Sequence, residues 1–143
     1  MTERHLQSDP PTEQQVAAAI ADIDEAIAQA NQQVDLSRAK SIIGVAGSVT
    51  TVAALALGLE QYDPHAIHQT RLTAKQVHDI CYKLLAMPRS ERAALGAMHE
   101  GRVDVIGGGA LILDRIMQAT GLSEIIVSEQ DILDGIARDL VTR

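Results

Sequence analysis

Residues 41–51 read SIIGVAGSVTT, and this stretch decides the fold. Its first part, Ser41–Ala46, is a short β-branched and apolar run, which predicts a buried strand. Gly47 and Ser48 predict a turn, and the apolar run Val49–Leu57 that follows predicts a helix buried on most of its sides. A strand that leads directly into a buried helix belongs near the centre of an α/β structure.

The turn Gly44–Ser48 has two alternative interpretations. Glycine lets a backbone approach an anion closely, and the free N–H groups at a helix N-terminus attract negative charge. The sequence matches neither G-x-x-x-x-G-K-[ST] nor G-x-G-x-x-G. Strand–glycine–helix turns are also common packing devices, so phosphate contact by Gly44, Gly47 and Ser48 and simple close packing both stay open.

A second glycine-rich helix start repeats this pattern. Gly107, Gly108 and Gly109 stand between Val103–Ile106 and an apolar helix predicted over Ala110–Thr120. Three consecutive glycines raise the entropy cost of folding, so we expect a specific reason for them. That reason is either close helix–sheet packing or an anion site. Two such starts in one α/β protein favour an arrangement in which both flank one cleft.

Composition excludes several classes of function. Tyr62 and Tyr82 are the only aromatic residues among 143, so the chain lacks the stacking platforms of single-stranded nucleic-acid binders. A net charge of −7 opposes binding to nucleic acids and anionic membranes. Cys81 is the single cysteine and lies on an apolar helical stripe, which predicts a core residue in a reducing cytoplasm. We find no apolar run of ~20 residues and no secretory signal, so we expect neither membrane insertion nor secretion.

Helices are predicted to dominate the chain. The capping-box patterns at Thr12–Gln15 and Thr73–Gln76 each predict a helix start, and Ser128 is expected to cap the last helix. Glu124–Val127 predicts a second strand, and His65–Arg71 is expected to be extended. Two strands are too few for helices with so much apolar surface, so the sequence predicts an incomplete α/β domain. We divide it into residues 1–60 (a strand–turn–helix half), 61–100 (a helical insertion) and 101–143 (a second α/β half).

Few residues suggest other chemistry. His65 and His68 have i, i+3 spacing but no third ligand, so no metal site is assigned. His68 and Arg71 are possible anion contacts, with a solvated loop as the alternative. No catalytic constellation of serine or cysteine with histidine emerges.

Several segments together resemble the C-terminal part of the second actin-like domain of the Ppx/GppA family of exopolyphosphatases and guanosine-pentaphosphate phosphatases, with the actinobacterial exopolyphosphatase-like members most similar. In order along the chain they are Ser8–Pro11, Gly44–Thr51 with Ala53, Ala54, Gly58 and Leu59, Tyr62–Pro64, His68–Thr73, Arg102–Ile106, Gly108–Ala110 and Val127–Ser128.

The resemblance implies a partial ribonuclease-H-like α/β domain of the actin and hexokinase superfamily, with few parallel strands and many covering helices. It implies a Mg²⁺-dependent enzyme that removes terminal phosphate from polyphosphate, or the 5′ phosphate from guanosine pentaphosphate. It also implies that Gly44–Ser48 matches the G-[TS]-x-G-T turn that lines the cleft, with Ser48 in place of the usual Thr, and that Gly107–Gly109 is the second cleft-lining start.

The family's first phosphate loop, its catalytic glutamate and its D-x-G-G-G-S-x-E loop have no counterpart here. Residues 127–135 also depart from the family pattern, with Asp131 for Gly and Leu133 for Arg. We therefore expect a fragment of a phosphohydrolase that is inactive alone, has no catalytic residue or bound metal of its own, and self-associates. The alternative is a non-catalytic structural module that dimerises through the exposed sheet edge at Ser41–Ala46.

Overall fold

The sheet is small and mixed in direction. A computed structural model describes residues 1–142, with three strands in the order β1-β3-β2. β1 (Ile43–Gly44) pairs in parallel with β3 (Glu124–Val127), while β2 (Arg71–Thr73) pairs with β3 in antiparallel fashion. β1 and β2 are therefore the edges of the sheet, and β3 is its centre.

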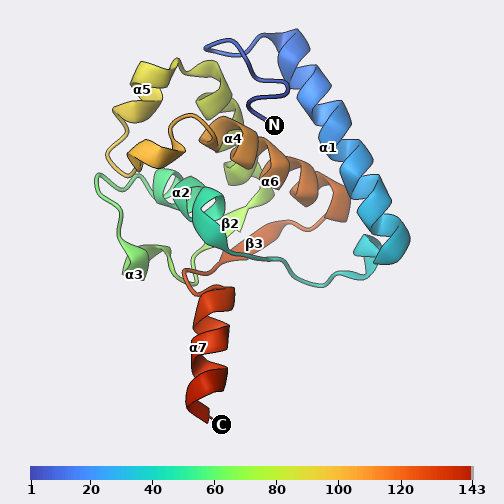
Figure 1. Cartoon of the computed structure of the whole chain (residues 1–143), viewed down its shortest axis with the longest axis vertical. Coiled ribbons are helices and arrows are strands. Elements are labelled where there is room, and N and C mark those ends of the chain that lie inside the picture. Colours follow the sequence, from blue (N-terminus) through green and yellow to red (C-terminus); the bar gives the residue numbers. More distant parts are fainter. Residues whose placement is uncertain (143) are drawn as a thin grey trace.

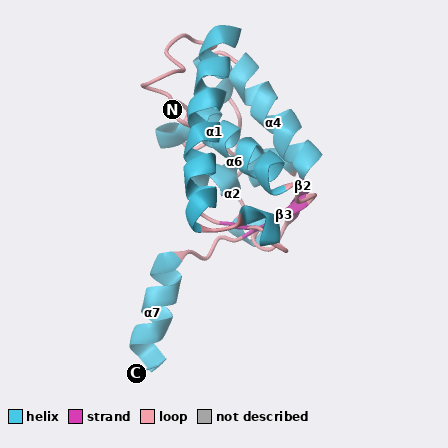
Figure 2. Cartoon of the chain, turned by 90° about the vertical axis from the view of Figure 1, so that its right-hand side faces the viewer, coloured by secondary structure: helices cyan, strands magenta, loops and turns pink. Residues whose placement is uncertain are grey.

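Four helices lie together on one side of this sheet in both views (Figures 1 and 2). They are α1 (Glu13–Gln33), α2 (Ala46–Ala56), α4 (Ala74–Ala86) and α6 (Ile106–Thr120). α6 is the central helix, because it contacts α1, α2 and α4. This arrangement confirms an α/β structure in which a few strands carry many covering helices.

The core is aliphatic, as the near absence of aromatic residues requires. Val52 from α2, Leu84 from α4, Leu111 from α6 and Ile125 from β3 are all 1% exposed or less. Fully burying each such side chain contributes about 1.5–3 kcal/mol. Cys81 is buried in the same core, which confirms its prediction as a core residue.

The two predicted capping boxes are present. Gln15 N–H donates to Thr12 Oγ1 over 3.2 Å, and Gln15 Oε1 accepts from Thr12 N–H over 3.1 Å. Thr73 and Gln76 form the same reciprocal pair at the start of α4. These signals are local in sequence, so the sequence locates both helix starts correctly.

Both glycine-rich helix starts differ from the prediction by a few residues. The strand predicted over Ser41–Ala46 is limited to Ile43–Gly44, and α2 begins at Ala46, so Gly47 and Ser48 lie in its first turn. α6 begins at Ile106, so Gly107–Gly109 are also helical. Glycine is poor in a helix interior but tolerable in the first turn, where close neighbours can require the missing Cβ.

Two further predictions are wrong. The segment His65–Arg71 is not extended throughout, because Pro64–Ile67 forms α3 and Asp63 Oδ1 accepts hydrogen bonds from the N–H groups of His65 and Ala66. The strand β2 that follows was missed, because its partner β3 lies about fifty residues further along the chain.

The last helix is α7 (Ile132–Thr142), and Ser128 does not cap it. Asp131 Oδ1 accepts from Leu133 N–H over 2.8 Å, while Ser128 Oγ donates to the Gln130 carbonyl. The remaining short elements are η1 (Leu36–Arg38), α5 (Arg89–Ala93) and η2 (Glu100–Arg102). No helix within residues 1–142 has both the length and the apolar character needed to cross a membrane.

Candidate phosphate-binding site

The two glycine-rich helix starts meet in space. A Cβ added to Gly109 of α6 would lie 2.3 Å from Ser48 Oγ of α2, so the two first turns are in direct contact. Ser48, Gly108 and Gly109 line one open cavity together with the N-terminal residues and two apolar side chains, Val105 and Ile112. Residues of both helix starts therefore border one depression of the surface.

These two helix starts also lack the side-chain caps found on the neighbouring helices. Neither Val45 before α2 nor Val105 before α6 supplies a side-chain hydrogen bond to the helix that it precedes. Thr12, Asp63 and Thr73 do so for α1, α3 and α4. The first N–H groups of α2 and α6 have no acceptor within their own helices, so they are available to an anion.

A cation lies against the first turn of α2. A Cβ on Gly47 would overlap the Arg102 guanidinium, 1.1 Å from Nη1 and 1.7 Å from Cζ, so the absence of a side chain at Gly47 leaves room for the guanidinium in this position. Arg102 is half-buried, and it forms no ion pair with any side chain of the described residues 1–142. A positive charge beside a helix N-terminus is unfavourable without an anion, because both carry the same sign.

Backbone strain occurs at the same turn. Ala46, between β1 and Gly47, has a φ of 66°, which is the left-handed region that non-glycine residues rarely adopt. Such strain persists only where the surroundings fix it, and it concentrates at functional turns. The turn is therefore held in one shape before any ligand arrives.

Tyr62, Glu129 and His68 form a hydrogen-bonded cluster that contacts α2 through Thr50. The Tyr62 hydroxyl donates to Glu129 Oε1 over 2.6 Å and lies 2.7 Å from Thr50 Oγ1 of α2. Burial first, and the hydrogen bond to Glu129 second, raise the pKa of Tyr62. His68 Nδ1 accepts from Glu129 N–H over 3.2 Å, which leaves Nε2 as its remaining polar atom.

Arg71 has a different environment from Arg102. It stands on β2 and forms an ion pair with Glu124 of β3, so its charge already has a partner.

The other two predicted site glycines differ in how closely their neighbours pack. Gly44 allows close packing, because a Cβ there would lie 2.6 Å from both Ile125 Cδ1 and Val49 Cγ1. Gly107 is less constrained, with Leu85 Cδ2 at 3.3 Å as the nearest atom.

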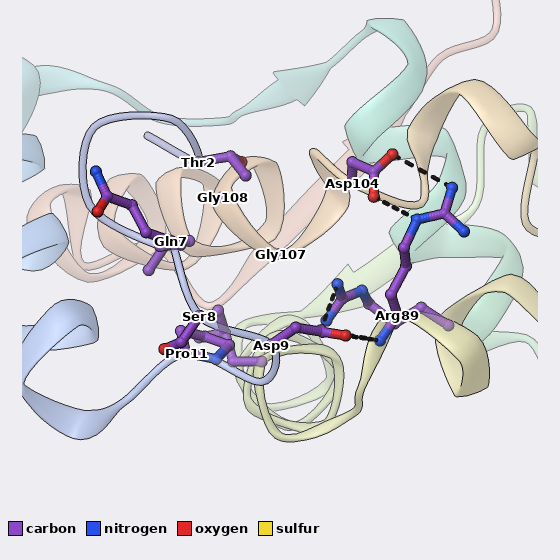
Figure 3. Close-up of a pocket in the computed structure, with 12 residues that line it drawn as sticks. Thr2, Gln7, Ser8, Asp9, Pro11, Arg89, Asp104, Gly107 and Gly108 are labelled. Carbon is purple, nitrogen blue, oxygen red and sulfur yellow. Dashed lines mark hydrogen bonds and ion pairs between the residues drawn. The ribbon is translucent and has the colours of Figure 1, made fainter.

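A second cavity adjoins the first at the N-terminus of α6, since Thr2 and Gly108 line both, and ion-paired side chains line it (Figure 3). Asp9 accepts from Arg89 N–H and from Arg92 Nη2, and Arg89 Nε donates to Asp104 Oδ1 over 2.7 Å. Arg92 is 9% exposed and also donates to the carbonyls of Val103 and Met87. These charged groups are paired with one another. The hydrogen bonds from Arg89 and Arg92 to Asp9 hold the N-terminal segment against α5, so we assign no ligand to this cavity.

The donor set at the meeting point of α2 and α6 does not fit Mg²⁺. It consists of N–H groups, the Ser48 hydroxyl and the Arg102 guanidinium beside Gly47, and Glu3 is the single carboxylate that lines the cavity, whereas Mg²⁺ prefers several carboxylate and phosphate oxygens. Within residues 1–142, no group of three or more His, Cys, Asp or Glu side chains is placed to hold a metal ion. No residue of this chain is therefore assigned to a metal.

Comparison with known proteins decides the family. The family model described as the Ppx/GppA phosphatase family matches residues 1–143. The chain belongs to the Ppx/GppA phosphatase family. Exopolyphosphatase 2 of Mycobacterium tuberculosis is 43% identical over 144 residues, a match that covers 98% of this chain and 45% of the relative. The chain thus spans a little under half the length of this curated relative.

Solved structures of Ppx/GppA proteins have the same fold. The crystal structure of an exopolyphosphatase-like protein matches with a TM-score of 0.92 and 41% identity, covering 97% of this chain and 46% of that one. A Ppx/GppA family member from Aquifex aeolicus matches with a TM-score of 0.85 and 26% identity, covering 99% of this chain and 45% of that one. The expected partial actin-like domain is confirmed.

The sequence pointed to the glycines and to Ser48 but not to the groups around them. Arg102 lies 55 positions from Gly47, and no local pattern connects the two. Glu129 was likewise not singled out, because its contacts with Tyr62 and His68 arise only when β3 lies beside β1 and β2. The one signal in the sequence is the run of glycines itself, since a residue without a Cβ leaves room for another side chain.

Proposed function

We propose that this chain forms one wall of the substrate cleft of an exopolyphosphatase-type phosphohydrolase. The substrate is inorganic polyphosphate or guanosine pentaphosphate, and the reaction releases a terminal phosphate. The observation that carries the proposal is the convergence of two uncapped helix N-termini with the unpaired Arg102 at Gly47, Ser48 and Gly109.

Each group in this wall has a distinct role in the proposal. The first N–H groups of α2 and α6 and the Ser48 hydroxyl donate to phosphate oxygens, and Arg102 supplies the positive charge. Hydrogen bonds from N–H groups and guanidinium to phosphate are about twice as strong as neutral ones. His68 stays a further candidate contact through Nε2, and Arg71 stays a candidate only if an anion displaces Glu124.

Hydrolysis itself is assigned to groups outside this chain. Attack on phosphorus needs a water molecule that is correctly oriented and a general base within hydrogen-bond reach of that water. We assign neither the orientation of the water nor the base to the N–H groups, Ser48 or Arg102. In this proposal the wall binds and orients the phosphate chain, and the catalytic glutamate and the metal are supplied from elsewhere in the enzyme.

The alternative function is a non-catalytic structural module. The exposed edge of β1 favours it, since an open strand edge invites pairing with another chain. A cytoplasmic location and self-association are predictions that accompany both alternatives.

Titration calorimetry with tripolyphosphate separates the two functions. Wild-type protein is expected to bind the anion, and Arg102→Ala is expected to weaken binding by about tenfold or more, since a charged hydrogen bond contributes about 1.5–3 kcal/mol. Arg38→Ala removes an exposed arginine of η1 that does not line this cavity, and it is the matched control. Arg71→Ala tests the other candidate cation. Equal binding by the wild-type and Arg102→Ala proteins would contradict the proposed site.

A further inference from the structure

A third cavity lies where the end of α2, the second half of α4 and the loop after α5 come together. Its volume is about 180 Å³. Most of its lining consists of apolar side chains, which are Leu55, Leu59, Ile80, Leu84, Met87 and Leu95. It shares no lining residue with the cavity beside Ser48 and Gly109 or with the cavity around Asp9, so it is a separate site.

The backbone at the end of α2 leaves little for a polar ligand to bind in this cavity. Gly58 N–H donates to the Leu55 carbonyl over 3.1 Å. Leu59 N–H donates to the Ala54 carbonyl over 3.0 Å. These carbonyls belong to the last turn of α2, where they would otherwise have no partner. Because they are already paired, this wall suits an apolar molecule.

Lys83 of α4 adds one positive charge to this apolar lining. Among the described residues 1–142, it is the one charged residue that lines the cavity. It is exposed and forms no ion pair with a described side chain, whereas Lys75 on the same helix pairs with Asp79. A lysine stem can cover apolar surface while its ammonium group stays in water. The cavity therefore complements a molecule that has an apolar body and one anionic group.

The volume limits how large that molecule can be. An apolar cavity of about 150 Å³, lined by leucine, isoleucine and phenylalanine, holds one benzene molecule. A cavity of about 180 Å³ thus has room for one six-membered ring, with a carboxylate directed toward Lys83. A long acyl chain or a peptide segment is too large for it.

We propose that this cavity binds a compact aromatic carboxylate of about the size of benzoate. The ring lies among the aliphatic side chains of α2 and α4, and the carboxylate pairs with the Lys83 ammonium. The proposal goes beyond the phosphohydrolase function and does not depend on it, because none of the groups of the phosphate-binding wall lines this cavity.

An NMR titration of the ¹⁵N-labelled full chain with benzoate at neutral pH tests the proposal. The amide signals of Gly58, Leu59, Leu95 and Gly96 are expected to shift in a saturable way. Benzyl alcohol has a similar size but no charge, so it is expected to bind about threefold more weakly, which is the effect of losing one exposed ion pair.

Lys83→Met keeps the apolar stem and removes the charge, so it should abolish the preference for benzoate over benzyl alcohol. Lys40→Met is the matched control, because Lys40 is also exposed but does not line the cavity, and it should leave the preference unchanged. Leu95→Trp is designed to fill the cavity and should prevent binding of both ligands. Circular dichroism establishes that the three variants are folded.

Three results would overturn the proposal. They are the absence of a saturable shift at the four amides, equal binding of benzoate and benzyl alcohol by the wild-type protein, and a preference for benzoate that persists in Lys83→Met. Inorganic phosphate is the anion control, and equal shifts with phosphate would also overturn the proposal, since Lys83 would then only attract anions. Tripolyphosphate binding is followed at the starts of α2 and α6, so the two proposals can fail independently.

Discussion

Ser48 of α2 and Gly109 of α6 touch so closely that no side chain fits at position 109. An added Cβ would lie 2.3 Å from Ser48 Oγ and 2.8 Å from Ser48 Cβ. The same contact brings two helix N-termini together and forms the wall of the proposed phosphate site. Stability and anion binding therefore depend on one packing relationship.

Gly109→Ala is predicted to destabilise the protein by ~2 kcal/mol, because the new methyl group forces α2 and α6 apart. Urea unfolding followed by circular dichroism measures the change. Gly135→Ala is the matched control, since a Cβ there would meet nothing within 4 Å and alanine is the better helix former. Equal stability of Gly109→Ala and wild type would show that the two helices are not in this contact.

Arg92→Lys is predicted to destabilise the fold almost as much as Arg92→Ala, by ~3 kcal/mol. The guanidinium serves three separate acceptors, the Val103 carbonyl, the Met87 carbonyl and Asp9, and a lysine ammonium cannot reach all of them from this buried position. Thermal and urea unfolding provide the comparison. Recovery of wild-type stability by lysine would mean that charge alone matters here.

Burial raises the pKa of the Cys81 thiol to about 12, with the charge of Asp114 as a second cause. Because the folded state holds the proton more tightly than the unfolded state, this group stabilises the fold fully below pH ~9, and the contribution is lost as the pH rises toward 12. At pH 8, native Cys81 should react with a disulfide reagent about a thousandfold more slowly than in urea. Rapid labelling of the native protein would contradict this burial.

The chain alone is predicted to release no phosphate from polyphosphate in the presence of Mg²⁺. It has the proposed binding wall, but residues 1–142 include no group of three or more His, Cys, Asp or Glu side chains placed to hold the metal ion, and the proposal assigns the base to another part of the enzyme. A colourimetric phosphate assay against a buffer blank provides the measurement. Release that co-purifies with the wild-type protein and is lost in Arg102→Ala would place a catalytic group in this chain.

Local signals predicted much of the fold, and contacts between distant segments explain what they missed. The capping boxes at Thr12 and Thr73 are complete within four residues, so both were identified correctly. β2 is three residues long and exists only through pairing with β3, so its own sequence carries too little pattern. For the candidate site, the glycines were visible in the sequence, but Arg102, whose guanidinium occupies the space beside Gly47, approaches it only in the folded chain.

The most direct test of the proposed site is an NMR titration of ¹⁵N-labelled protein with tripolyphosphate. If the starts of α2 and α6 bind phosphate together, the amide signals of Gly47, Ser48, Gly107 and Gly108 should shift in a saturable way, and Arg102→Ala should weaken the response at all four. Shifts confined to other positions, or no saturable shift at these four amides, would contradict the phosphate-binding wall.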